Sequence, residues 1–244
     1  MKCIILAAGY ATRLYPLTKD TPKPLISVAG KPIIEHIIYR LEELEKIDEI
    51  FVVTNDKFYN HFLTWSNNFS NGTKITIVND GTESNEDRLG AIGDIHYVIK
   101  DKNILEDTIV IAGDNLFEFS LQHMHDFFSQ KNSTVVAFRD LKDKALIAGK
   151  YGTAHLDESG KILEFQEKPE IPKSSLASTA CYLFTKDDFF ALERCIAENN
   201  QPDNLGDFIK YLSARKHVYA YVFEEKWFDI GSHDQLKEAE NHFS

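Results

Sequence analysis

The chain has no long apolar run and few cysteines, and both absences narrow the class of protein. None of its apolar stretches approaches the roughly 18 residues of a membrane span. The N-terminal run from Cys3 to Ala8 is shorter than the apolar region of a signal peptide. Only three cysteines occur among 244 residues, without a CxxC pair, which disfavours a disulfide framework and structural zinc. We therefore expect a cytoplasmic location and no membrane partner.

Positive charge is also scarce. The 27 lysines and arginines face 38 aspartates and glutamates, which gives a net charge of -11. Because this excess repels a phosphate backbone, we expect no nucleic-acid partner. A site for an anion must then be local, built from a few cations placed together. With 43% hydrophobic residues, the chain is long enough to bury a core in one large domain.

What is present is a regular alternation of apolar strand and helix patterns. Strands are predicted at 2–8, 49–54, 74–78, 108–112, 133–139, 179–184 and 217–223, with helices between most of them and a last helix at 233–241. Strands of continuous apolar character are typical of a parallel sheet covered on both faces. The segment 151–169 predicts a local antiparallel hairpin that turns at 158–160. The fold class is therefore α/β, a Rossmann-like α/β/α sandwich with a mostly parallel central sheet and a small antiparallel hairpin.

The opening segment MKCIILAAGYATRLYPLTKDTPKPL concentrates hydrogen-bond donors directly after the first strand. Backbone N–H groups and cationic side chains that converge after a strand form a phosphate site in many α/β proteins. Neither common phosphate loop fits, however. The glycine spacing is not GxGxxG, which argues against a Rossmann dehydrogenase, and Lys23 precedes Pro24 rather than the Ser or Thr of a P-loop. The segment predicts a phosphate site of another kind.

The motifs along the chain resemble those of the nucleotidyltransferase family that makes nucleoside-diphosphate sugars, which includes glucose-1-phosphate thymidylyltransferase-type and uridylyltransferase-type enzymes. The pieces in family order are LAAGYATRLYPLTKDTPKPL, LGAIGDI at 89–95, IAGDN at 111–115, YGT at 151–153, FQEKP at 165–169, LGDFIKYL at 205–212 and WFDIGSHDQL at 227–236. Each piece alone is weakly specific, but together and in order they span nearly the whole chain. The resemblance implies an enzyme that joins an NTP to a sugar 1-phosphate and releases pyrophosphate.

Roles follow from the resemblance and from side-chain chemistry. Arg13 and Lys23 are expected as catalytic residues that hold and neutralise the triphosphate. Asp114 follows a strand directly and is expected to bind Mg²⁺, with Asp229 as the second carboxylate. The remaining nucleotide-binding candidates are Leu6, Ala7, Ala8, Gly9, Ala11, Thr12, Gly90 and Ala91, together with Asp114. The acceptor-binding candidates are Gly152, Glu167, Lys168, Tyr182 and Trp227.

Two regions depart from the family pattern. The acidic loop at 80–88, ahead of Gly90, is longer and more polar than expected, and it is either a mobile flap or a solvated loop. In the strand after EKP, many relatives carry an Asn and a Gly ahead of the tyrosine, whereas this chain reads Ser178-Thr179-Ala180-Cys181-Tyr182. The identities of the base and of the acceptor are therefore open.

Two other functions are alternatives to a sugar-phosphate nucleotidyltransferase. A cytidylyltransferase that uses an alcohol phosphate such as phosphocholine would need an aromatic cage. The cage candidates are Phe117, Phe119, Tyr182, Trp227 and Phe228. A regulatory subunit that only binds nucleotide sugar would be expected to lack Arg13, Lys23 or an aspartate, and none is missing. We expect one catalytic domain over 1–244 without a C-terminal β-helix, with NTP and sugar 1-phosphate as partners; whether the chain forms a homo-oligomer is open.

Overall fold

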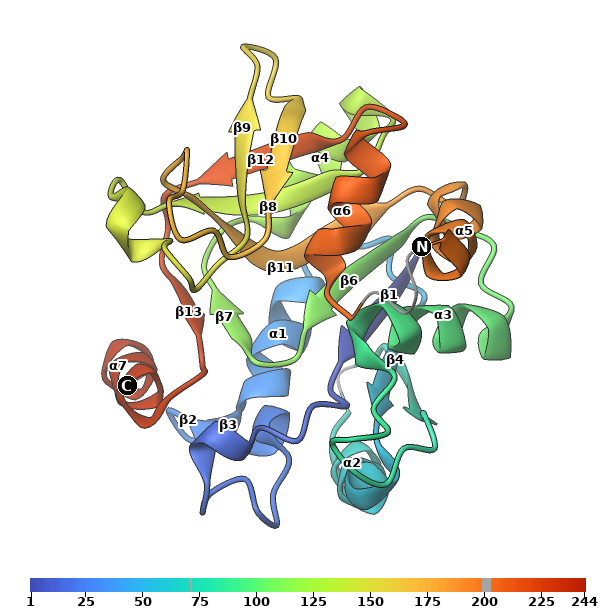
Figure 1. Cartoon of the computed structure of the whole chain (residues 1–244). Coiled ribbons are helices and arrows are strands. Elements are labelled where there is room, and N and C mark those ends of the chain that lie inside the picture. The colour runs from blue at the N-terminus through green and yellow to red at the C-terminus, as the bar shows by residue number, and fades with distance from the viewer. Residues whose placement is uncertain (71, 199–202) are drawn as a thin grey trace.

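The computed structural model of the chain describes residues 1–70, 72–198 and 203–244. A seven-stranded sheet lies at its centre (Figure 1), in the order β12-β8-β11-β6-β1-β4-β5. The strands are β1 Lys2–Leu6, β4 Glu49–Thr54, β5 Lys74–Asn79, β6 Thr108–Ala112, β8 Val135–Asp140, β11 Leu176–Phe184 and β12 Tyr219–Phe223. Neighbouring strands run parallel except at β11, which is antiparallel to both β6 and β8. The predicted α/β class with a mostly parallel sheet is confirmed.

Helices cover both faces of this sheet. They are α1 Ile33–Leu41, α2 Asp56–Asn68, α3 Gly90–Lys102, α4 Leu121–Lys131, α5 Asp188–Glu198, α6 Leu205–Ser213 and α7 His233–Phe243. Apolar residues of α1, α2, α4 and α7 share one core with Cys3 and Ile5 of β1. Those of α3, α5 and α6 share a second core with Ile4. Because successive side chains of a strand point to opposite faces, β1 is buried from both sides, as its continuous apolar run predicts.

Side-chain caps fix where several helices begin. Asn55 accepts a hydrogen bond from the Phe58 backbone N–H at 3.0 Å at the start of α2. Ser120 does the same for His123 at the start of α4, and Ser232 for Gln235 at the start of α7. Each cap satisfies a backbone donor that has no partner inside the helix. Within the part of the chain that the structure describes, no helix is both long and apolar enough to cross a membrane.

Three two-stranded ribbons accompany the sheet. The predicted hairpin is confirmed as β9 Thr153–Leu156 with β10 Ile162–Gln166, and Gly160 takes a φ of +80° in its turn. Two ribbons were not predicted: β2 Ser27–Val28 with β3 Lys31–Pro32, and β7 Asn115–Phe117 with β13 Trp227–Asp229. Short 3-10 helices lie at Thr12–Leu14, Lys23–Leu25 and Lys144–Leu146. The β7–β13 ribbon matters most for function, because it joins distant parts of the chain beside the end of β6.

Candidate functional site

The loop that follows β1 is held from inside the protein. The Ala7 backbone N–H donates to the Val53 carbonyl at 2.8 Å. The Asn55 side chain donates to the Ala8 carbonyl at 2.8 Å, and the Thr18 hydroxyl donates to the Ala11 carbonyl at 2.7 Å. Ala11 itself adopts a left-handed conformation with φ +47° before the first 3-10 helix. The loop is therefore fixed in shape before any ligand arrives, which is the arrangement that phosphate binding requires.

Two cationic side chains lie at this loop in different surroundings. Arg13 is exposed and makes no ion pair within the described residues. The Lys23 side chain is only 11% exposed, and its Nζ lies 2.6 Å from Oδ2 of Asp114. Both residues line the same cavity, together with Gly9 and Ala11. Arg13 is thus free to bind a ligand, whereas Lys23 must exchange or share its partner to do so.

Asp114 reaches Lys23 because β6 lies directly beside β1. The Gly113 N–H donates to the Leu6 carbonyl at 2.8 Å. A Cβ atom on Gly113 would lie 2.8 Å from that carbonyl oxygen and 3.1 Å from Cγ of Pro24. A side chain would therefore force the two segments apart, so glycine is needed for the close approach. This contact explains why a glycine stands between the strand TIVIA and the carboxylate of Asp114.

The ribbon of β7 and β13 brings Asp229 next to Asp114. Asp229 pairs with Asn115 across the ribbon, and the Ile230 N–H donates to the Asp114 carbonyl at 3.1 Å. The Trp227 indole N–H donates to Oδ1 of Asn115 at 2.6 Å, which fixes the ribbon from the side. Burial raises the pKa of Asp229 to about 6, and the negative charge of Asp114 adds to the shift. The site therefore holds two neighbouring carboxylates.

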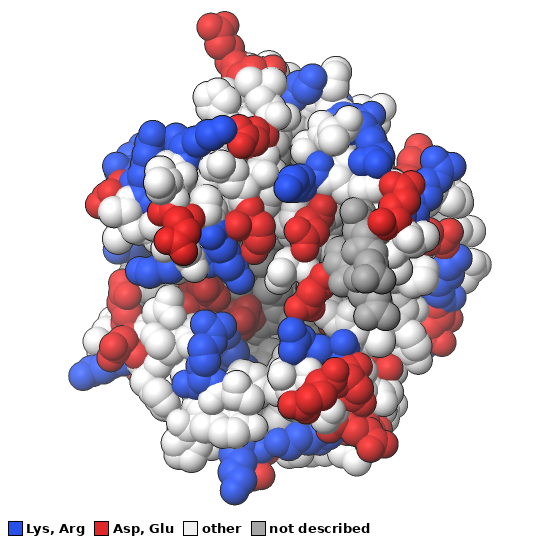
Figure 2. Space-filling model, viewed as in Figure 1, with Lys and Arg blue, Asp and Glu red and all other residues white. Residues whose placement is uncertain are grey.

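Two cavities meet at these groups. The first pocket, of about 340 Å³, lies between the loop after β1 and the start of α3. The second pocket, of about 850 Å³, extends from Asp114 and Asp229 toward β9, β11 and α6. Leu6, Arg13, Ala91, Ala112 and Asp114 line both. Figure 2 shows acidic and basic side chains interspersed around the hollow on this face. A ligand in one pocket can therefore reach a ligand in the other at Arg13 and Asp114.

The sequence candidates separate between the two pockets. The nucleotide-binding candidates that line the first pocket are Leu6, Ala7, Ala8, Gly9, Ala11, Gly90, Ala91 and Asp114. Thr12 is exposed at the start of a 3-10 helix and lies outside both pocket linings. The acceptor candidates all line the second pocket: Gly152, Glu167, Lys168, Tyr182 and Trp227. Their functional roles stay predictions.

Glu167 is a partly buried acid of the second pocket. A Cβ on Gly206 would lie 2.0 Å from its Oε2, and one on Gly152 would lie 3.0 Å from the same atom. Two glycines therefore leave the space that this carboxylate occupies. Burial raises the pKa of Glu167, although the nearby Lys168 charge opposes the shift. Lys168 is 53% exposed, takes a φ of +42°, and holds its Nζ 3.8 Å from Oε1 of Glu167.

The aromatic side chains do not form a cage of the kind that phosphocholine would need. Phe117, Phe119 and Phe228 are buried in the core and lie outside the second pocket. Phe117 stacks on Phe119 with ring centroids 4.6 Å apart. Only Tyr182 and Trp227 of the five candidates line the pocket. The geometry gives this interpretation little support.

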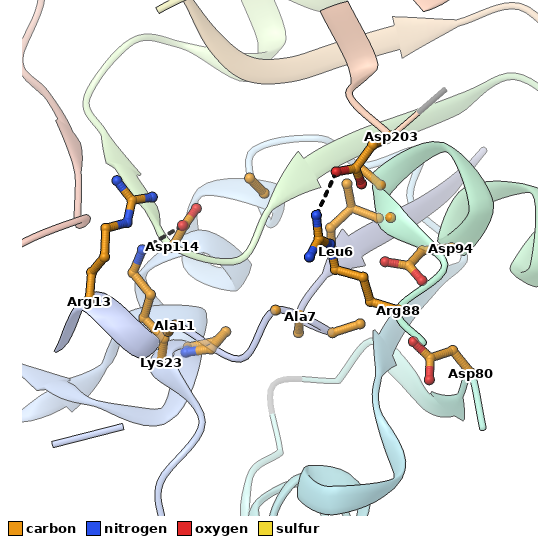
Figure 3. Close-up of a pocket in the computed structure, with 16 residues that line it drawn as sticks. Leu6, Ala7, Ala11, Arg13, Lys23, Asp80, Arg88, Asp94, Asp114 and Asp203 are labelled. Atoms are coloured by element: carbon orange, nitrogen blue, oxygen red, sulfur yellow. Dashed lines mark hydrogen bonds and ion pairs between the residues drawn. The ribbon is translucent and has the colours of Figure 1, made fainter. Parts of the chain in front are cut away.

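A group of charged residues at the far end of the first pocket was missed from the sequence. It contains Asp80, Arg88, Asp94 and Asp203, and Figure 3 shows it across the cavity from Arg13, Lys23 and Asp114. Nη2 of Arg88 lies 2.9 Å from Oδ2 of Asp203. Within the loop at 80–88, the Asp87 carboxylate accepts from the backbone N–H groups of Glu83 and Ser84 at 3.1 and 2.8 Å. A charged residue inside the helical pattern of GAIGDIHYVI was the available signal.

A parallel sheet with a cationic loop and two carboxylates at the carboxyl ends of its strands is typical of α/β proteins that bind nucleotides. The chain belongs to the nucleotidyl transferase family, whose family model matches residues 2–244. The resemblance in the sequence motifs is thereby confirmed.

Relatives in sequence and in structure agree with this assignment. The bifunctional protein GlmU of Methanocaldococcus jannaschii is 32% identical over 242 residues, which cover 98% of this chain and 53% of that protein. GlmU of Methanococcus aeolicus is 29% identical, with 99% and 54% covered. The chain thus spans about half the length of these relatives. A Bacillus anthracis protein assigned as a glucose-1-phosphate thymidylyltransferase, solved with a sucrose, superposes with a TM-score of 0.83 at 26% identity, covering 100% of this chain and 95% of the other.

A second solved structure shows the same fold. UDP-glucose pyrophosphorylase complexed with UDP-glucose superposes with a TM-score of 0.83 at 24% identity. The superposition covers 99% of this chain and 97% of that chain. At this identity the likeness supports the Rossmann-like fold alone.

Proposed function

We propose that this chain transfers a nucleotidyl group from an NTP to a sugar 1-phosphate and releases an NDP-sugar and pyrophosphate. The observation that carries the proposal is the junction of two pockets at Arg13 and Asp114. One pocket has the fixed loop and the two cations that a triphosphate needs. The other has the acid, lysine and glycines that fit a sugar phosphate. The α-phosphorus belongs at the junction, where both substrates meet.

The reaction needs little covalent chemistry from the protein. An oxygen of the acceptor phosphate attacks the α-phosphorus, and the bond to the oxygen that bridges to the β-phosphate breaks, so pyrophosphate leaves with that electron pair. Arg13 and Lys23 hold the triphosphate and offset its charge during this displacement. Their positions at the loop place two positive charges beside the triphosphate, and no covalent enzyme intermediate is required.

Asp114 and Asp229 suit a Mg²⁺ ion that binds together with the triphosphate. Mg²⁺ prefers one or two carboxylates and completes its shell with phosphate oxygens and water. The described residues form no cluster of three or more His, Cys, Asp or Glu side chains, so phosphate oxygens would supply the missing ligands. Burial and then the charge of Asp114 raise the pKa of Asp229, as expected for a carboxylate pair whose repulsion a cation would relieve. When bound, Mg²⁺ supplies charge neutralisation for the phosphates.

The second pocket suits a sugar phosphate. Lys168 is exposed at the pocket wall and can bind the acceptor phosphate. Glu167 can accept hydrogen bonds from sugar hydroxyl groups, and Gly152 and Gly206 leave room beside it. Tyr182 and Trp227 contribute apolar surface to the wall of this pocket. The Bacillus anthracis protein assigned as a glucose-1-phosphate thymidylyltransferase supports this acceptor class.

One assay tests this function directly. The protein is incubated with Mg²⁺, each NTP or dNTP in turn and a panel of sugar 1-phosphates and alcohol phosphates, and pyrophosphate release is measured. We expect release with one sugar 1-phosphate, and its loss in excess chelator. Full turnover in chelator would contradict the metal role. Absence of release with every pair would contradict the proposed function.

A further inference from the structure

The far end of the first pocket holds charges that a triphosphate does not need. Its four charged residues come from separate segments: Asp80 follows β5, Arg88 precedes α3, Asp94 lies within α3, and Asp203 precedes α6. Figure 3 shows them grouped opposite Arg13 and Lys23. If the phosphates lie at the loop after β1, as the proposed function has it, the base of the nucleotide extends toward this group. The chemistry of these side chains then bears on which base fits.

Asp80 and Asp94 are deeply buried carboxyl groups with incomplete hydrogen bonding. They are 8% and 6% exposed, and no N–H or hydroxyl donor of the described residues reaches Oδ2 of Asp80 or Oδ1 of Asp94. Among the described residues, neither lies within ion-pair distance of a lysine or arginine. A buried carboxyl pair without a cation is costly unless the two groups share a proton or a ligand supplies donors.

The two carboxyl groups interact with each other. Burial raises the pKa of Asp94 to about 8, and the charge of Asp80 adds to the shift. At neutral pH the pair therefore holds one proton between its facing oxygens. The other Asp80 oxygen, Oδ1, accepts from the Thr82 N–H and hydroxyl, each at 2.7 Å. The second oxygen of Asp94 is left as an acceptor for a group in the pocket.

The remaining charged side chains at this end, Arg88 and Asp203, are paired with each other. Nη1 of Arg88 donates to the Asn85 carbonyl at 3.1 Å, and Nη2 donates to Asp203. Oδ1 of Asp203 lies against the bare Cα of Gly90, since a Cβ there would be 2.1 Å from it. Among the described residues at this end of the cavity, three carboxyl groups therefore accompany a single cation, Arg88.

Bases differ in whether they can satisfy such acceptors. Cytosine, adenine and guanine carry an exocyclic amino group, whereas uracil and thymine present carbonyl oxygens in its place. A carbonyl oxygen directed at the accepting oxygen of Asp94 leaves both acceptors unpaired and repelling, which is a basis for discrimination. We propose that Asp94 selects an NTP whose base carries an exocyclic amino group, over UTP and dTTP.

Equilibrium binding to the intact protein with Mg²⁺ and without acceptor tests this. Two matched pairs differ in one amino group replaced by a carbonyl oxygen: CTP against UTP, and ATP against ITP. GTP and dTTP complete the panel. The tightest of CTP, ATP and GTP should bind at least about tenfold more tightly than the tightest of UTP, dTTP and ITP, as expected for one hydrogen bond to a charged group.

Substitution at Asp94 then assigns the effect to this residue. Asp94→Asn keeps the shape and adds an N–H donor, so it should reduce the preference for amino bases about tenfold. Asp101→Asn is the control, because Asp101 is exposed on the same helix and lies outside the pocket lining. If Asp94→Asn does not fold, the wild-type comparison still decides.

The inference is wrong if UTP, dTTP or ITP binds as tightly as the best amino-bearing nucleotide, or if a correctly folded Asp94→Asn keeps the full preference. This outcome is separate from the proposed function. Pyrophosphate release with UTP would leave the transferase activity standing and overturn only the base selection. An amino-base preference without any pyrophosphate release would support the base selection and contradict the transferase activity.

Discussion

Lys23 and Arg13 carry the same charge but differ in burial, and this separates their expected mutant behaviour. Losing one preorganised donor to a developing charge lowers a rate by a factor of roughly 100 to 1,000. Arg13→Ala should therefore turn over far more slowly but change the free energy of unfolding by less than about 0.5 kcal/mol, because the side chain is exposed and unpaired within the described residues. Steady-state rates and urea unfolding of the purified variant measure both quantities.

Lys23→Ala should lose activity and also stability, because it leaves Asp114 without its 2.6 Å partner and next to Asp229. From the sequence alone, Arg13 and Lys23 are both expected to be exposed loop residues whose removal has little effect on folding. The buried ion pair changes that expectation for Lys23 alone. If both alanine variants keep near-parental rates at saturating substrate, the loop after β1 has no catalytic role.

The raised pKa of Asp94 predicts a pH dependence of stability. A carboxyl group whose pKa is higher in the folded state stabilises that state fully at low pH. That stability is lost as the pH rises from about 4, its unfolded value, toward about 8. The parent protein should thus lose up to about 1.4 kcal/mol per pH unit from this group in that range. Asp94→Asn should remove this slope and be the more stable protein at pH 8.

Urea unfolding at pH 5, 6.5 and 8 measures the effect, with Asp101→Asn on the exposed side of the same helix as the control. The gap in unfolding free energy between Asp94→Asn and the parent should widen as the pH rises. A gap that is constant with pH would mean that Asp94 titrates alike in the folded and unfolded states.

At the scale of elements, α6 predicts a mutant that affects only the acceptor. Gly206 lies in its first turn, and a methyl group there would fall 2.0 Å from Oε2 of Glu167. Gly206→Ala should displace this carboxylate and raise the KM for the acceptor, while the Kd for NTP stays the same. Lys210→Ala on the exposed side of α6 is the control.

Glu167→Ala should reproduce the loss without crowding, since it removes the same carboxylate. An equal weakening of NTP binding in either variant would show that the two pockets are not independent. An unchanged acceptor KM in both would remove Glu167 from the acceptor site.

Most elements could be predicted from the sequence because their apolar patterns are long. The strands at 49–54 and 108–112 were predicted with their observed bounds, and the last helix, predicted at 233–241, runs from His233 to Phe243. The direction of β11 could not be read, because a continuous apolar run such as TACYLF is the same in a parallel or an antiparallel strand. The strands β7 and β13 were not predicted, because three residues are too few to show the alternation of apolar and polar side chains that marks a strand.

Site residues could be predicted where the chain carries the motifs of the family in the family's order. They could not be predicted where the chain departs from those motifs. Asp114 and Asp229 were paired by resemblance alone, and the ribbon gives the physical reason for their proximity. Asp94 was not predicted as a site residue, because a single polar residue beside Ile95 and Val98 is ordinary in an amphipathic helix. Its buried position depends on the packing of α3 against β1, β4, α5 and α6, which no local pattern contains.

At the scale of the whole molecule, the site draws on both cores. Cys3 and Ile5 of β1 lie in one and Ile4 in the other, so binding should stabilise the chain as a single unit. NTP with Mg²⁺ at 100 times its Kd adds about 2.7 kcal/mol. That corresponds to a rise in Tm of roughly 5–10 °C for a domain of this size.

Differential scanning calorimetry with and without ligand measures this shift. A single transition that moves as a whole is expected from one domain over the chain. Two transitions, of which only one moves, would instead indicate two units that unfold independently.

The ribbon of β7 and β13 has a consequence for any break in the chain. Each of its strands comes from a different half of the sequence, and each half contributes one of the two neighbouring carboxylates. A cut at the exposed turn near Gly160 divides the protein into an Asp114 fragment and an Asp229 fragment. Neither fragment contains the pair, so activity in a mixture of the two would report fragment complementation, and β7–β13 pairing would be the step that restores it.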